Sequence, residues 1–91
     1  MGNFRLHSSL IAKYSHFDEL LTVLNELSNN LVLCNYFNVE ISLNDTLIIV
    51  DAEWEDETSY RTSISYGKTT ELIKLAKSMI SGIVLNKSNS M

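Results

Sequence analysis

The strongest constraint on the fold is a pair of alternating segments on either side of Asn44-Asp45. Residues 37–43 alternate apolar and polar side chains, and residues 46–54 are rich in β-branched and aromatic ones. Both patterns are typical of β-strands. Asn and Asp favour the left-handed backbone of a two-residue type I′ turn. The sequence therefore predicts an antiparallel hairpin that these two residues close.

The register of this hairpin determines which side chains are buried. A two-residue turn places Val39 opposite Val50 on the apolar side of the sheet. On the other side Glu40 lies opposite Ile49, and Leu47 lies nearby. We expect helices to cover only the apolar side. Leu47 and Ile49 then form a small exposed apolar patch with a polar rim.

A third strand is predicted over residues 58–66. Aromatic, β-branched and aliphatic side chains alternate there with Ser and Arg, which is the period of a strand. The acidic residues 55–57 would form the preceding loop. A three-residue loop would also place Asp51 opposite Arg61, a favourable pair across the two strands.

A first helix is predicted before the hairpin. Apolar side chains recur there at spacings of three and four residues, the period of an amphipathic helix. They are Leu10, Tyr14, Phe17, Leu21 and Leu24. Ser8, Ser9 or Ser15 can cap the start of this helix, and Asn29 or Asn30 suits its end.

A second helix is predicted over residues 72–83, where apolar side chains again follow the helical period. Gly67 or Thr69 is expected to cap it. The fold class is therefore α+β, in the order helix, three-stranded antiparallel β-meander, helix (αβββα), with both helices on one face of the sheet. The 91 residues suit a single domain, ordered over about 8–85 with a flexible polar tail at 86–91.

Cysteine content and hydropathy indicate the compartment. Cys34 is the single cysteine, so no disulfide can form within the chain, which favours a reducing environment. The longest apolar stretch, residues 47–50, is far too short to cross a bilayer. We expect a cytoplasmic protein that does not associate with membranes.

Charge is distributed unevenly along the chain. Residues 15–59 contain ten acidic residues and no Lys or Arg, a segment charge of −10. The preceding residues carry +2 and the following ones +4, which sums to the net charge of −4. Such an acidic segment attracts basic partners and repels nucleic acid.

Catalytic and metal-binding patterns are not recognisable in the sequence. His7 and His16 lack partners at the spacing of metal ligands, and a zinc site needs about four such ligands. Cys34 lies in an acidic stretch, which disfavours the reactive thiolate. We therefore predict no metal, no cofactor and no enzymatic activity, although catalytic groups can converge from distant positions.

The predicted function is that of a small acidic binding protein, an inhibitor or immunity-type factor. It would occlude a basic surface of another protein or of a nucleic-acid-processing enzyme, with carboxylates steering the encounter and Trp54 as a buried anchor. The predicted contact residues are Glu40, Leu47, Ile49, Asp51, Glu53, Trp54, Glu55, Asp56 and Glu57.

The predicted order of elements also resembles that of double-stranded-RNA-binding domains, in topology only and over Ser15 to Leu85. That resemblance implies nucleic-acid binding through Lys68, Lys74 and Lys77, as an alternative function. The order is similar, too, to that of some small acidic phage-encoded inhibitors of CRISPR nucleases. A homodimer joined through the open sheet face or an edge strand is a further alternative.

Overall fold

The computed structural model describes residues 3–42 and 47–87. Four strands and three helices follow one another along the chain. They are β1 (Phe4–Ala12), α1 (Phe17–Asn30), β2 (Cys34–Ile41), β3 (Ile48–Trp54), α2 (Glu57–Ile64), α3 (Lys68–Ser78) and β4 (Ile80–Lys87). The strands form one sheet in the order β2-β3-β1-β4, with antiparallel neighbours throughout. This arrangement is ferredoxin-like, with α2 and α3 sharing the place of the second helix.

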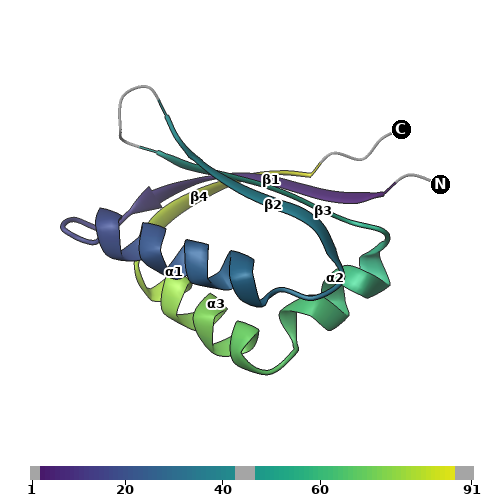
Figure 1. The fold of residues 1–91 in the computed structure, drawn as a ribbon. Helices are drawn as coiled ribbons and strands as arrows, with labels where there is room; N and C mark the ends of the chain where they lie inside the picture. The colour runs from purple at the N-terminus through teal and green to yellow at the C-terminus, as the bar shows by residue number, and fades with distance from the viewer. Residues whose placement is uncertain (1–2, 43–46, 88–91) are drawn as a thin grey trace.

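Two layers make up the molecule (Figure 1). The helices lie on one face of the sheet, and the other face is uncovered. The α+β class and the placement of all helices on one face are thus confirmed. The three-stranded meander and the αβββα order are wrong, because the chain has a strand at each end of the fold.

The β2–β3 hairpin has the predicted register. Val39 pairs with Val50, and Glu40 pairs with Ile49. Val50 is buried, whereas Ile49 on the opposite face is half-buried. The predicted turn at Asn44-Asp45 lies outside the described residues.

The first predicted helix combined two elements that the structure separates. Leu10 belongs to β1, the strand between β3 and β4, where it is buried. Tyr14 is 96% exposed in the connection to α1, and Ser15 has a left-handed backbone (φ 70°). A helical period therefore continued by chance through a strand and a turn. Helix α1 begins at Phe17, close to the later of the predicted starts.

The predicted third strand is instead α2. The side chain of Asp56 caps this helix, accepting a hydrogen bond of 2.8 Å from the Ser59 backbone N–H. Arg61 pairs with Glu57 one turn away, at 2.8 Å, and not with Asp51. The segment is short, so its alternation of apolar and polar side chains did not distinguish a strand from a helix of two turns.

The last predicted helix also ends earlier than expected. Gly67 lies at the N-cap of α3, as predicted, with a φ of 50° that favours glycine. The chain leaves the helix at Met79 and continues as the edge strand β4. Gly82 in β4 lies close to β1, since a Cβ there would come within 3.3 Å of Ile11.

The core lies between the helices and the inner face of the sheet. From α1 and α3 it receives Leu20, Leu24 and Leu72, and from the sheet Leu10 and Ile48. No helix in the described part of the chain is long and apolar enough to cross a membrane.

Candidate ligand cavity between the sheet and the helices

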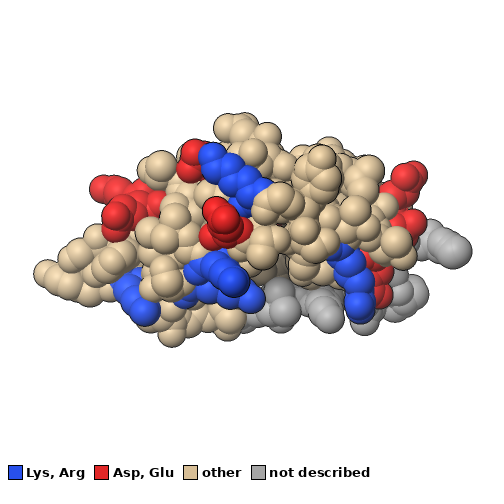
Figure 2. All heavy atoms as spheres, turned by 90° about the horizontal axis from the view of Figure 1, so that it is seen from below, with Lys and Arg blue, Asp and Glu red and all other residues tan. Residues whose placement is uncertain are grey.

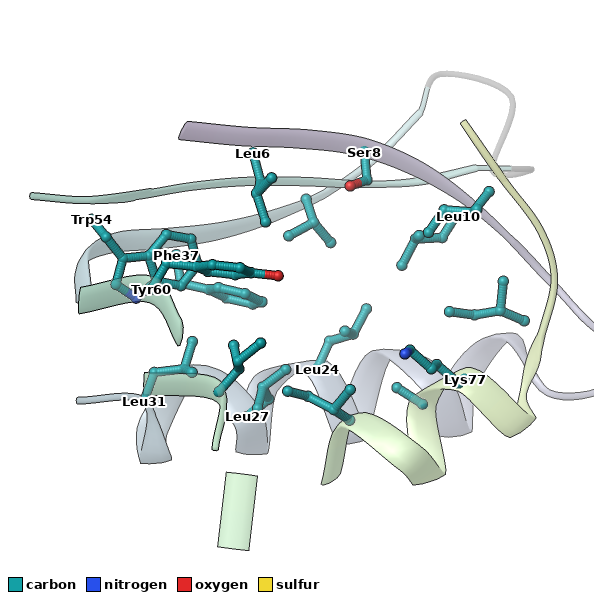
Figure 3. A pocket seen from close by; sticks show the side chains of 16 residues that line it. Leu6, Ser8, Leu10, Leu24, Leu27, Leu31, Phe37, Trp54, Tyr60 and Lys77 are labelled. Carbon is teal, nitrogen blue, oxygen red and sulfur yellow. The ribbon is translucent and has the colours of Figure 1, made fainter. Parts of the chain in front are cut away.

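A cavity of about 190 Å³ lies between the inner face of the sheet and the helices (Figure 3). Most of its walls are aliphatic, contributed by side chains such as Leu6, Leu24, Leu27 and Ile73. An apolar protein cavity of roughly 150 Å³ is large enough to bind benzene. The cavity is therefore large enough for a compound of one or two rings.

One end of the cavity is aromatic. Trp54, Phe37 and Tyr60 line it together, from β3, β2 and α2. The rings of Trp54 and Tyr60 meet edge to face, with centroids 4.8 Å apart. The ring centroids of Phe4 and Tyr60 are 4.7 Å apart. The edges and faces of these rings can pack against the ring of an aromatic ligand.

Three polar side chains reach the apolar space from different elements. Figure 3 shows the hydroxyl of Ser8 pointing inward from β1, that of Tyr60 from α2, and the ammonium of Lys77 from α3. Ser8 is only 8% exposed. An apolar pocket with a few convergent polar groups is the usual form of a small-molecule site.

The protonation of Tyr60 suits it to donate a hydrogen bond. Burial raises the pKa of its phenol, with smaller contributions from Arg61, which lowers it, and Glu57, which raises it. The phenol therefore stays protonated at neutral pH and can donate to an oxygen of a ligand. Ser8 can donate or accept, and the ammonium of Lys77 can only donate.

The opening of the cavity is marked by its exposed lining residues. Among the described residues that line it, Lys77 and Ile83 are exposed and the others are buried or half-buried. They lie on α3 and β4. A molecule would thus enter beside Lys77, with the aromatic residues at the far end.

The lining contains no carboxylate, imidazole or thiol among the residues that the structure describes. These are the usual protein ligands of metal ions, so the lining offers no such donor set. Cys34 lies outside it, with its single S–H shared between the carbonyls of Tyr36 (3.0 Å) and Glu53 (3.6 Å). Burial raises the pKa of the Cys34 thiol, which makes it a poor nucleophile.

Several of the predicted contact residues lie on the uncovered face of the sheet, as expected. Ile49 lies between Glu40 of β2 and Ser9 of β1, so Glu40 and Ile49 are neighbours there. Asp51 pairs with Arg5 at 3.4 Å. Leu47 is half-buried and directly precedes the first residue of β3.

Glu53 on the same face is bound by neighbouring side chains. It accepts a hydrogen bond of 3.1 Å from Asn35 and another from Asn3, and Arg5 lies 3.9 Å away. These two amides, ahead of Arg5, lower the pKa of the Glu53 carboxyl. This carboxylate thus has partners within its own chain.

The other predicted contact residues do not form an exposed hairpin tip. Trp54 is only 2% exposed, so it is no surface anchor. Asp56 caps α2, Glu57 is its first residue, and Glu55 is exposed beside them. The acidic loop of the sequence prediction is therefore a helix start, where negative charge complements the helix dipole.

The three lysines of the nucleic-acid alternative all lie on α3, at residues 68, 74 and 77. Figure 2 shows Lys and Arg interspersed with Asp and Glu on the helical face, rather than gathered in one basic patch. Lys77 alone among these three lines the cavity.

Sequence reasoning missed Ser8 and Tyr60 as site residues and assigned Lys77 to another role. Tyr60 was placed in a strand. Ser8 carried a usable signal, because Phe4, Leu6 and Leu10 alternate around it. A single hydroxyl among the inward-facing apolar side chains of a strand indicates that this position serves something other than core packing.

Comparison with known proteins finds similarity in structure alone, since no family model and no curated protein matches the sequence. A protein from Chloroflexus aurantiacus J-10-fl with the provisional name antibiotic biosynthesis monooxygenase has a TM-score of 0.81 at 17% identity, covering 99% of this chain and 96% of its own. A similarly named protein from Bacteroides thetaiotaomicron VPI-5482 has a TM-score of 0.85 at 13% identity, covering 99% and 90%. An antibiotic biosynthesis monooxygenase has a TM-score of 0.80 at 15% identity, covering 97% and 98%.

These similarities show the fold of the chain, a small ferredoxin-like α+β domain with a four-stranded antiparallel sheet. They overturn the interpretation of the chain as a phage-type inhibitor that occludes a basic surface. That interpretation also depended on a different order of elements and on an exposed Trp54. Homodimer formation stays a prediction.

Proposed function

We propose that the chain binds a small, mainly apolar ring compound in the cavity and acts on it as an oxygenase-type enzyme. The observation that carries the proposal is the cavity itself, with aromatic residues at one end and three polar side chains aimed into it. The names of the structural neighbours, which refer to monooxygenases of antibiotic biosynthesis, support the enzymatic part.

Each lining group has a role in this proposal. Trp54 and Phe37 hold the ring by contact, and the aliphatic walls exclude water from it. Ser8 and Tyr60 orient the compound through its oxygen atoms. Hydrogen bonds to a developing oxyanion would lower the barrier to oxidation, because the donors are already in place before the reaction.

Calorimetric titration with a neutral two-ring compound such as naphthol tests binding. We expect saturable binding to the wild-type protein and its loss in Ser8→Leu, where the larger side chain occupies the cavity. Ser9→Leu is the matched control, because Ser9 lies on the opposite face of the same strand. Equal binding by both variants, each shown to be folded by circular dichroism, would place the ligand outside the cavity.

Isotopically labelled dioxygen tests the enzymatic part. A monooxygenase places one oxygen atom of O₂ in the product and the other in water. A phenolic substrate can supply the electrons itself, as in naphthol + O₂ → naphthoquinone + H₂O. Incubation of a bound compound with the labelled gas should give a product that carries one labelled atom, detected by mass spectrometry. Tight binding without labelled product from any ring compound in a broad panel would leave a binding protein and remove the oxygenase.

A further inference from the structure

We infer that the compound bound in the cavity carries an acidic group, a carboxylate or an ionised phenol, which pairs with Lys77 at the opening. This inference rests on the proposed function and specifies the class of ligand. The observation behind it is the charge of the lining: among the described residues that line the cavity, Lys77 is the one with a permanent charge at neutral pH.

The positions of the polar groups give the ligand a direction. The aromatic residues lie at one end of the cavity, and the exposed Lys77 lies towards the other end, on the last turn of α3. A ring held by Trp54 and Phe37 would therefore point its substituent towards the ammonium. The charge of that substituent would stay partly in water, so its desolvation cost is small.

The inner groups favour the same orientation. Ser8 is more than nine-tenths buried and has its hydroxyl aimed into the cavity, where the register of β1 would otherwise place an apolar side chain. Tyr60 presents a protonated phenol from the other side. Both can donate to oxygen atoms of the ligand, and no carboxylate in the described lining would repel an anion.

Among the side chains that the structure describes, the other charged groups near the cavity do not replace Lys77. Helix α3 also carries Lys68, Glu71 and Lys74, all exposed and none part of the cavity lining. Asp18 and Glu19 of α1 line a separate shallow groove with Leu75 and Met79. An anion at the opening therefore meets Lys77 first.

A matched pair of ligands tests the inference: naphthoate and the corresponding naphthamide, which differ in charge but hardly in shape. By calorimetry at neutral pH, wild type should bind the acid about tenfold more tightly than the amide, the strength of a charge-assisted hydrogen bond. Lys77→Met keeps the length of the side chain and should remove this preference while leaving amide binding within about twofold of wild type.

Lys74→Met is the control variant, because it removes the same charge from the same helix outside the cavity. It should retain the preference, and Lys77→Arg should retain it as well. Equal affinities for acid and amide in wild type would overturn the inference and leave the proposed function standing. So would equal losses in the two Met variants, since these would report net charge alone. Failure of acid, amide and naphthol alike to bind would overturn both.

Discussion

The two faces of the sheet carry polar groups that are satisfied in different ways. On the uncovered face the polar side chains bind one another, as Asp51 does with Arg5 and Glu53 does with Asn35. On the inner face Ser8 points into a cavity, which Lys77 reaches from α3 on the opposite side. Polar groups that complete each other need no ligand, whereas polar groups around an apolar cavity suit one. The charge pattern of the sequence drew attention to the uncovered face, but the better candidate site is on the inner face.

The largest difference between the faces should appear in stability. Ile48 is fully buried and its neighbour Ile49 is half-buried on the opposite side of β3. Ile48→Ala should lower the free energy of unfolding by about 2–4 kcal/mol, through lost burial and a new cavity. Ile49→Ala should lower it by roughly 1 kcal/mol or less. Urea denaturation measures both free energies of unfolding. Similar losses in the two variants would contradict the expected difference in packing between the two faces.

A gain in stability is expected at Ser8, where a polar side chain takes the place of an apolar one in the cavity wall. Ser8→Val adds apolar atoms to the cavity wall and should raise the free energy of unfolding by about 0.5–2 kcal/mol, while weakening ligand binding. Ser9→Val on the uncovered face should change stability by less than about 0.5 kcal/mol. Destabilisation by Ser8→Val would indicate that the hydroxyl has a structural partner rather than a ligand.

The acidic residues after β3 should affect helix α2 and its stability against pH. Asp56 has a pKa lowered chiefly by the hydrogen bond from the Ser59 backbone N–H. Its charged form therefore stabilises the fold above the pKa of the unfolded state, about 3.9, and this contribution is lost as the pH falls through the lower folded value.

Asp56→Ala should thus lower the melting temperature at neutral pH by roughly 2–5 °C, whereas Glu55→Ala should leave it nearly unchanged. The difference between the Asp56 variant and wild type should shrink below about pH 4. Thermal melts over a pH series check this. A difference that is constant down to low pH would assign the effect to something other than the charged cap.

The smallest effect is expected for an ion pair on the uncovered face. Arg5 and Asp51 are both substantially exposed, with side-chain exposures of 48% and 29%. Arg5→Gln should shift the urea midpoint by no more than the error of the measurement, because solvent screens such pairs. A large shift would show that the pair organises β1 and β3, and would weaken the contrast between the faces.

The hairpin and its register could be predicted because alternation and turn chemistry agreed there. The strand β1 was missed because Leu10 also fits a helical period with Phe17 and Leu21. The polar Ser8, which lines the cavity, interrupts the apolar alternation of Phe4, Leu6 and Leu10. The strand β4 was hidden in the same way, because Ile83 continues the period of α3.

The candidate site was less accessible to prediction than the fold. Its polar groups come from β1, α2 and α3, and two of these elements were misassigned, so their convergence could not be foreseen. The volume of a cavity depends on how side chains of distant elements pack, which no local pattern specifies. Trp54 is an example. Its acidic neighbours in the sequence suggested an exposed side chain, but Trp54 lies on the inner face of β3 and is buried.

The most direct test of the account is to map naphthoate binding on both faces by NMR of the labelled backbone and indole. Trp54 is the single tryptophan, so its indole N–H gives one signal that reports on the aromatic end of the cavity. We expect the largest shifts at Trp54, Ser8 and Lys77, with Arg5 and Asp51 unchanged. Shifts centred on Arg5 and Asp51, with the indole signal unmoved, would contradict it.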